Sequence, residues 1–115
     1  MAKGLCHIAL KTSSLKQTED FYVDVLGLKV AFRHPPSMIF LTTPGGHDLI
    51  NFVRSSKRSL DNGCFDHMGF KVTRKQLLAM AARLKYHGVK IIDRRGKNAF
   101  YIRDPNASQI EYYCD

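Results

Sequence analysis

The sequence repeats itself with a period of 60 residues, and the repeat brings chemically related side chains into register. His67 lies 60 residues after His7, and Glu111 lies 60 residues after Asn51. Each histidine occurs in a short, largely apolar segment, Leu-Cys-His-Ile-Ala-Leu in the first copy and Phe-Asp-His-Met-Gly-Phe in the second. A repeat of this kind predicts two copies of one supersecondary unit that face each other and pool side chains at a shared metal centre.

The composition is that of an ordinary globular domain, with 115 residues, of which 44% are hydrophobic and 24% charged. No apolar run approaches the roughly 20 residues of a membrane-spanning helix, and the first strand follows no signal-peptide core. We therefore expect a cytoplasmic protein with no membrane contact. Cys6, Cys64 and Cys114 form no CxxC pair, which predicts buried thiols in a reducing compartment, facing away from the metal.

The net charge of +8 is compatible with an anionic partner, yet the basic residues are scattered along the chain. Neither a nucleic-acid motif nor a basic stripe interleaved with aromatic residues occurs, so we expect no nucleic-acid partner. An anionic small-molecule substrate and a merely solvated basic surface are the remaining interpretations.

Hydrophobic periodicity predicts the element order βαβββ twice, which is an α+β fold in a single domain, 1–115. The first module, 4–54, has a helix that ends at Gly27; its predicted strands and helix span 4–11, 15–26, 28–33, 38–42 and 47–53. A polar, turn-forming linker occupies 55–63. The second module, 64–115, has predicted elements at 64–72, 74–86, 89–94, 97–103 and 108–114, and the inner stripe of its helix is Leu77, Leu78, Ala81 and Leu84.

Strand parity places three candidate metal ligands on inward faces. His7 and His67 point away from their sequence neighbours, and Glu111 points away from Ile110 and Tyr112. Two imidazoles and one carboxylate leave half of an octahedral coordination sphere open, an arrangement suited to one divalent ion such as Fe2+, Mn2+, Ni2+ or Zn2+. Taken singly, each residue has an ordinary structural explanation, and their coincidence with the repeat favours the metal site.

Further polar and charged residues are candidates for catalysis or substrate binding. A hairpin would bring the Tyr101 phenol near Glu111, where it could donate to a bound oxyanion or simply pack. His47 shares a face with Asn51 and is either a base or the end of a strand. Asn51 could ligate a hard cation or hydrogen-bond a substrate or water. Basic residues are also expected near the rim, where their charge would attract an anionic substrate: Arg94, Arg95, Lys97 or Arg103.

Four segments, Gly4 to Leu10, Asp20 to Val30, Asp66 to Phe70 and Asp104 to Glu111, resemble the vicinal oxygen chelate superfamily. It groups glyoxalase I, extradiol dioxygenases, fosfomycin-resistance enzymes, methylmalonyl-CoA epimerase and bleomycin-resistance proteins. The resemblance implies that paired βαβββ modules form a cup around a divalent metal. It places His7, His67 and Glu111 at ligand positions and Asn51 at a fourth. Because small members commonly complete the cup between subunits, it also implies a homodimer.

The resemblance implies a small metal-dependent enzyme, similar to an extradiol dioxygenase or glyoxalase, that chelates an oxygen-rich, anionic substrate. Asn51 stands where glyoxalase I usually has Glu or Gln, and Tyr101 matches a tyrosine of dioxygenases and fosfomycin enzymes. Asp48 occupies the position of a dioxygenase histidine, with His47 beside it, and Ala9 that of a threonine in fosfomycin enzymes. The alternatives are a binding or sequestration protein of the same fold and a fosfomycin-type transferase.

Overall fold

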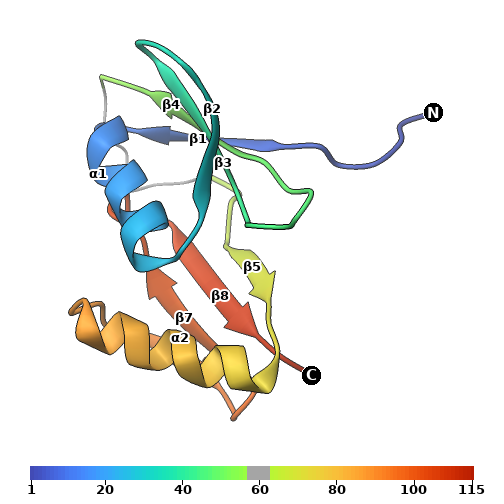
Figure 1. Cartoon of the computed structure of the whole chain (residues 1–115), viewed down its shortest axis with the longest axis vertical. Helices are drawn as coiled ribbons and strands as arrows, with labels where there is room; N and C mark the ends of the chain where they lie inside the picture. The colour runs from blue at the N-terminus through green and yellow to red at the C-terminus, as the bar shows by residue number, and fades with distance from the viewer. Residues whose placement is uncertain (57–62) are drawn as a thin grey trace. The chain divides into compact units, whose positions relative to one another are not determined.

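The chain divides into two compact units, Met1–Arg58 and Ser59–Asp115, in a computed structural model that describes residues 1–56 and 63–115. Each unit has the order βαβββ and one four-stranded sheet, which confirms the predicted α+β class and the two βαβββ modules (Figure 1). Most of the predicted linker, 55–63, lies outside the described residues. None of the helices in the described parts is both long and apolar enough to span a bilayer.

The first unit has a mixed sheet in the order β1-β4-β3-β2, in which β1 and β4 run parallel and the other neighbours antiparallel. Its elements are β1 Ile8–Thr12, α1 Leu15–Asp20, η1 Phe21–Val25, β2 Lys29–His34, β3 Met38–Thr42 and β4 Ile50–Arg54.

The helical segment of this unit begins at a hydroxyl cap and ends in a wider turn. The Ser14 side chain accepts from the Gln17 backbone N–H, which satisfies one of the free donors of the first turn. The last turn is a π-helix, η1, in which the Leu26 N–H donates to Phe21 O at 3.1 Å. Gly27 then stops the helix with φ +81°, a conformation that side chains other than glycine rarely adopt.

The core of the first unit lies between this helical segment and one face of the sheet. Tyr22 and Phe52 are fully buried, with ring centroids 4.9 Å apart. Because side chains alternate along a strand, the core position of Phe52 directs Asn51 to the other face of β4. The core therefore fixes which face of this sheet is available for chemistry.

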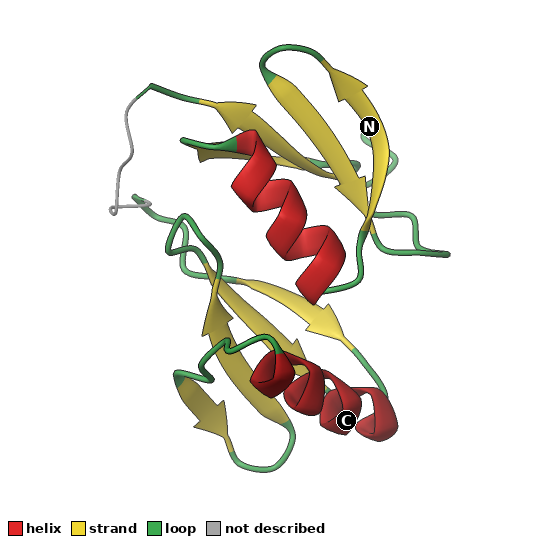
Figure 2. Ribbon diagram, turned by 60° about the vertical axis from the view of Figure 1, so that its left-hand side comes forward, coloured by secondary structure: helices red, strands yellow, loops and turns green. Residues whose placement is uncertain are grey.

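The second unit repeats this topology, with the sheet order β5-β8-β7-β6 and a parallel β5–β8 pair. Figure 2 shows α2 lying along this sheet. Thr73 and Gln76 form a capping box at the start of α2, and the helix keeps its predicted bounds. The elements are β5 Met68–Lys71, α2 Arg74–Tyr86, β6 Asp93–Arg95, β7 Ala99–Arg103 and β8 Gln109–Tyr113.

The core of the second unit contains Leu77, Leu84, Phe100, Ile102, Ile110 and Tyr112. Leu77 and Leu84 are two helical turns apart and lie on the buried side of α2. Leu78 was predicted on the same stripe, but that prediction is wrong, because its side chain is 64% exposed. The inner stripe of α2 is therefore narrower than the hydrophobic pattern indicates.

Several strands are shorter at their N-terminal ends than predicted. β1 begins at Ile8, β5 at Met68 and β4 at Ile50, since the parallel registers open with Ile8 opposite Ile50 and Met68 opposite Ile110. His7 and His67 therefore lie immediately before their strands, where strict alternation of side chains no longer applies.

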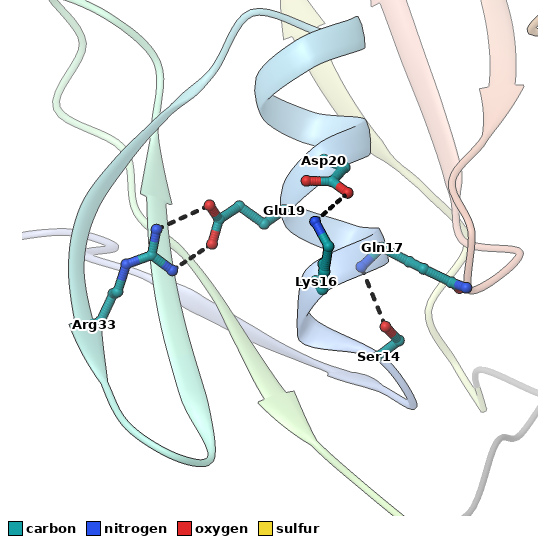
Figure 3. Close-up of polar contacts among 6 residues, drawn as sticks. All are labelled: Ser14, Lys16, Gln17, Glu19, Asp20 and Arg33. Carbon is teal, nitrogen blue, oxygen red and sulfur yellow. Dashed lines mark hydrogen bonds and ion pairs between the residues drawn. The ribbon is translucent and has the colours of Figure 1, made fainter.

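An ion pair on the surface of the first unit connects α1 to β2 (Figure 3). The Arg33 guanidinium binds the Glu19 carboxylate through two hydrogen bonds, one of them 2.9 Å between Nη2 and Oε2. This contact is the main cause that holds the pKa of Glu19 below its ordinary value. Lys16 pairs with Asp20 at 3.1 Å, but both of these side chains are largely exposed.

We expect Glu19→Gln to lower the free energy of unfolding by about 0.5 to 1 kcal/mol at about pH 7. The pKa of Glu19 is lower in the folded state than in the unfolded state. The stabilisation is therefore complete above the unfolded-state pKa and disappears as the pH falls through the folded-state pKa. Denaturant titrations at about pH 7 and pH 3 should show a smaller difference between wild type and variant at the lower pH. Asp20→Asn is the control, since its exposed pair should contribute less, and an equal loss in both variants would contradict the prediction.

Candidate functional site

The parallel pairing of β5 with β8 brings His67 beside Glu111. Gly69 is the register partner of Glu111, and His67 lies two residues before Gly69, just ahead of β5. The His67 Nε2 atom is 3.3 Å from Glu111 Oε1. The imidazole is about one third exposed, whereas the Glu111 side chain is 9% exposed. The structure thus places two of the three predicted metal ligands next to each other.

Asp66 fixes the orientation of this imidazole. Its Oδ2 atom is 2.6 Å from His67 Nδ1, so that Nε2 is the nitrogen that faces Glu111. Strand alternation predicted that Asp66 points away from His67, and this prediction is wrong, because residues 64–67 precede β5. A carboxylate on the far nitrogen of a histidine orients the ring and increases its basicity, as is common for histidines that bind metals.

The Glu111 carboxylate accepts two hydrogen bonds on its other oxygen, from Arg95 Nη2 at 2.8 Å and from the Tyr101 hydroxyl at 3.0 Å. Burial of the carboxylate works to raise the pKa of Glu111. The hydrogen bonds from Arg95 and Tyr101 and the charges of Arg95 and His67 outweigh it, so the pKa lies below its ordinary value. Glu111 is therefore held in the charged form that a metal ion requires.

The geometry of His67 and Glu111 fits two neighbouring ligands of one ion. Donor atoms at about 2.1 Å from a shared ion are separated by roughly 3.0 Å at an octahedral corner and 3.4 Å at a tetrahedral one. The observed separation of 3.3 Å lies in this range. Within 1–56 and 63–115, no group of three or more His, Cys, Asp or Glu side chains is assembled to hold a metal. The pair is therefore a partial site that needs further ligands.

Gly69 leaves the space above the carboxylate open. A Cβ atom at this position would lie 3.4 Å from Glu111 Oε1 and 3.3 Å from the Tyr113 ring. The backbone of Gly69 is not in the left-handed region, so a side chain here would be limited by space and not by backbone strain. Glycine at this position keeps the face of Glu111 accessible.

In the first unit, the equivalent positions hold His7 and Asn51. Asn51 is 6% exposed, its Nδ2 atom contacts Met38 Sδ at 3.7 Å, and its Oδ1 atom has no hydrogen-bond partner among the described residues. His7 is exposed and meets the Phe40 ring edge-on, with centroids 6.0 Å apart. A buried amide oxygen without a donor is costly, and a bound ligand or ion would satisfy it.

The segment before β4 is organised by Asp48. Its carboxylate accepts from the Thr43 N–H at 2.8 Å, the Thr43 hydroxyl at 2.7 Å and the Thr42 hydroxyl at 3.1 Å. These hydrogen bonds outweigh partial burial and lower the pKa of Asp48. Asp48 thus closes the loop, and His47 is an exposed loop residue instead of a strand residue as predicted.

The pairing of β6 with β7 places the neighbouring arginines Arg94 and Arg95 on opposite faces of the sheet. Arg94 pairs with Phe100, a core residue, and therefore lies on the face of β6 opposite to Glu111. Arg95 pairs with Ala99 on the Glu111 face and is the arginine that reaches the carboxylate. Arg103 donates to Ala107 O at 3.2 Å, in the turn before β8. The sequence predicted Arg95 near the rim but ended the strand at Arg94, so it did not predict the contact of Arg95 with Glu111.

The cysteines take no part in this cluster. Cys114 is buried as predicted, but Cys6 and Cys64 are exposed, so the prediction of buried thiols is wrong for these two. Both precede the strands to which they were assigned, and the shorter β1 and β5 leave them outside the sheets.

The chain belongs to the glyoxalase/bleomycin resistance protein/dioxygenase superfamily, whose family model matches residues 4–112. Metapyrocatechase 2 from Cupriavidus necator is 29% identical over 119 aligned positions. These cover the whole of this chain but only 37% of that protein.

Solved structures share the fold at low sequence identity. Fosfomycin resistance protein FosX from Listeria monocytogenes superimposes with a TM-score of 0.82 at 20% identity, over 100% of this chain and 93% of that one. A mutant of that protein, complexed with Mn(II) and 1S,2S-dihydroxypropylphosphonic acid, gives 0.80 at 20% identity over 98% and 90%. Lactoylglutathione lyase from Agrobacterium tumefaciens gives 0.73 at 19% identity over 99% and 95%. These likenesses establish the glyoxalase/dioxygenase-like fold.

We expect Gly69→Val to weaken Mn(II) binding by at least about tenfold, or ~1.4 kcal/mol, because the new side chain stands over Glu111 Oε1. Valine suits a strand, so the fold should remain. Isothermal titration with Mn(II) measures the effect. Lys71→Val is the matched control, with the same new side chain on the same face of β5 two residues further along. Equal affinities for Gly69→Val and wild type would contradict the prediction.

Proposed function

We propose that the protein is a small enzyme that depends on a divalent metal and acts on a small, oxygen-rich, anionic substrate. His7, His67 and Glu111 would hold the ion. The observation that carries the proposal is the 3.3 Å separation of His67 Nε2 and Glu111 Oε1, both oriented by further side chains. The unpartnered Oδ1 atom of Asn51 supports a second polar contact, to the substrate or the ion.

A bound divalent ion would supply a Lewis acid that holds two neighbouring substrate oxygens. The chain's own residues have distinct tasks around it. Asp66 would hold a proton on His67 Nδ1, so that the neutral ring would present its Nε2 lone pair to the ion. Tyr101 donates to Glu111 in this structure, and in our proposal its hydroxyl would turn to a bound substrate oxygen. The positive charge of Arg95 favours an anionic substrate nearby.

Within the superfamily, a dioxygenase-like or glyoxalase-like reaction is the form that we propose. The similarity to Metapyrocatechase 2 over the whole chain supports the first, although the chain spans only 37% of that relative. The likeness to a lactoylglutathione lyase supports the second through the fold alone. We place His47 outside the essential residues, since it is exposed in a loop that Asp48 closes.

Two alternatives have specific support. The Arg95 contact neutralises Glu111 without a metal, which is compatible with a protein that only binds a small molecule. The likeness to fosfomycin resistance protein FosX supports a fosfomycin-type transferase, but Ala9 provides no hydroxyl beside the first histidine. We also propose that the protein is a homodimer, in which the cup that contains His7 is completed within one chain or between two.

We expect Glu111→Ala to abolish stoichiometric metal binding, from about one equivalent per chain to less than about one tenth. The fold should persist, because Glu111 lies on the polar face of the sheet and not in its core. Elemental analysis after purification and Mn(II) titration measure the stoichiometry, and circular dichroism checks the fold.

His87→Ala is the control, since His87 caps the end of α2 and should leave the metal untouched. A wild-type protein that binds no divalent ion, or a Glu111→Ala variant that binds a full equivalent at unchanged affinity, would favour the binding-protein alternative.

A further inference from the structure

The two oxygen atoms of the Glu111 carboxylate have different partners. Its Oε2 atom accepts from Arg95 at 2.8 Å and from Tyr101 at 3.0 Å, whereas Oε1 faces His67 Nε2 at 3.3 Å. Since the carboxylate is planar, the two donors on Oε2 also fix the direction in which Oε1 points. Both bonds end on an ionised acceptor, but only the Arg95 bond also has a charged donor, which makes it an ion pair as well.

Arg95 reaches this position across the sheet. It lies on β6 at the edge, and Glu111 lies on β8, with β7 between them. The residue of β7 opposite Arg95 is Ala99, a small, buried residue, and the residue opposite Glu111 is Tyr101. The small side chain at Ala99 leaves room for the long arginine, while Tyr101 completes the contact from the intervening strand.

The number of carboxylate oxygens that bind an ion decides how many positions remain for substrate. With His7, His67 and one oxygen of Glu111 as ligands, an octahedral ion keeps about three open positions. If both Glu111 oxygens bind, as carboxylates often do with divalent cations, about two remain. A substrate that chelates through two oxygens then leaves no position for water or a second reactant.

We propose that Arg95 is a positioning residue that restricts Glu111 to binding the metal through Oε1 alone. Arg95 occupies Oε2 and so preserves the open positions that a chelating substrate needs. This inference rests on the proposed function, because it assumes a divalent ion at His67 and Glu111. In this role Arg95 would act on the metal only through Glu111.

Mn(II) alone is the probe, and the number of water molecules on the bound ion, measured by water-proton relaxation, is the readout. Wild type should hold about three waters, and Arg95→Gln about one fewer, since the freed Oε2 atom replaces a water. Arg95→Lys, which keeps a charged donor, should restore most of the wild-type water number.

Arg94→Gln is the matched control, because it removes the same charge from the neighbouring position of β6 but on the opposite face. Its water number should equal that of wild type. A water number that is unchanged or increased in Arg95→Gln overturns the inference while leaving the metal site in place. Absence of Mn(II) binding by wild type overturns the proposed function, and this inference with it.

Discussion

The parallel pairing of the first and last strands in each unit is the constraint on which the candidate site depends. β1 joins β4 and β5 joins β8, although roughly 40 residues of chain separate the partners in each case. Closing such a loop costs entropy that local contacts do not offset, so the helix and the two other strands must form with it. As a result, residues that are distant in the sequence, such as His67 and Glu111, become neighbours. A change that loosens β5 from β8 therefore disrupts the site before it disrupts the core.

The second unit stabilises a buried charge on the sheet face that its core does not use. A carboxylate that is 9% exposed is costly to keep ionised unless it is paired and hydrogen-bonded. Arg95, Tyr101 and His67 provide those contacts, and all three come from other strands or their ends. The registers of the sheet fix Arg95 and Tyr101, whereas His67 lies just before β5 and is oriented by Asp66. Pairing of the strands thus brings Arg95 and Tyr101 to the Glu111 carboxylate.

Much of the fold was predictable from the sequence, because the two halves share one pattern of apolar residues and turns. The α2 helix and the β3 strand have their predicted bounds, and parity placed Tyr101 beside Glu111. Contacts beyond local periodicity were not predictable. The turn between β6 and β7 decides that Arg95 and not Arg94 faces Glu111. Likewise, β1 and β5 begin later in the chain than predicted. Asp66 can therefore contact His67, and Cys6 and Cys64 lie outside the strands and are exposed.

The two sheets use one register to present different chemistry. Across the first sheet, register partners form the row Ala9, Asn51, Phe40 and Phe32; across the second, the row is Gly69, Glu111, Tyr101 and Asp93. Both rows begin with a small residue, which keeps the face of the next residue open. In the second row the Tyr101 phenol lies beside the Glu111 carboxylate and donates to it. In the first row two stacked phenylalanine rings, 4.3 Å apart, lie on one side of the Asn51 amide. The two units therefore share one register, yet the row of the second presents a hydrogen-bonded carboxylate and the row of the first an amide beside aromatic rings.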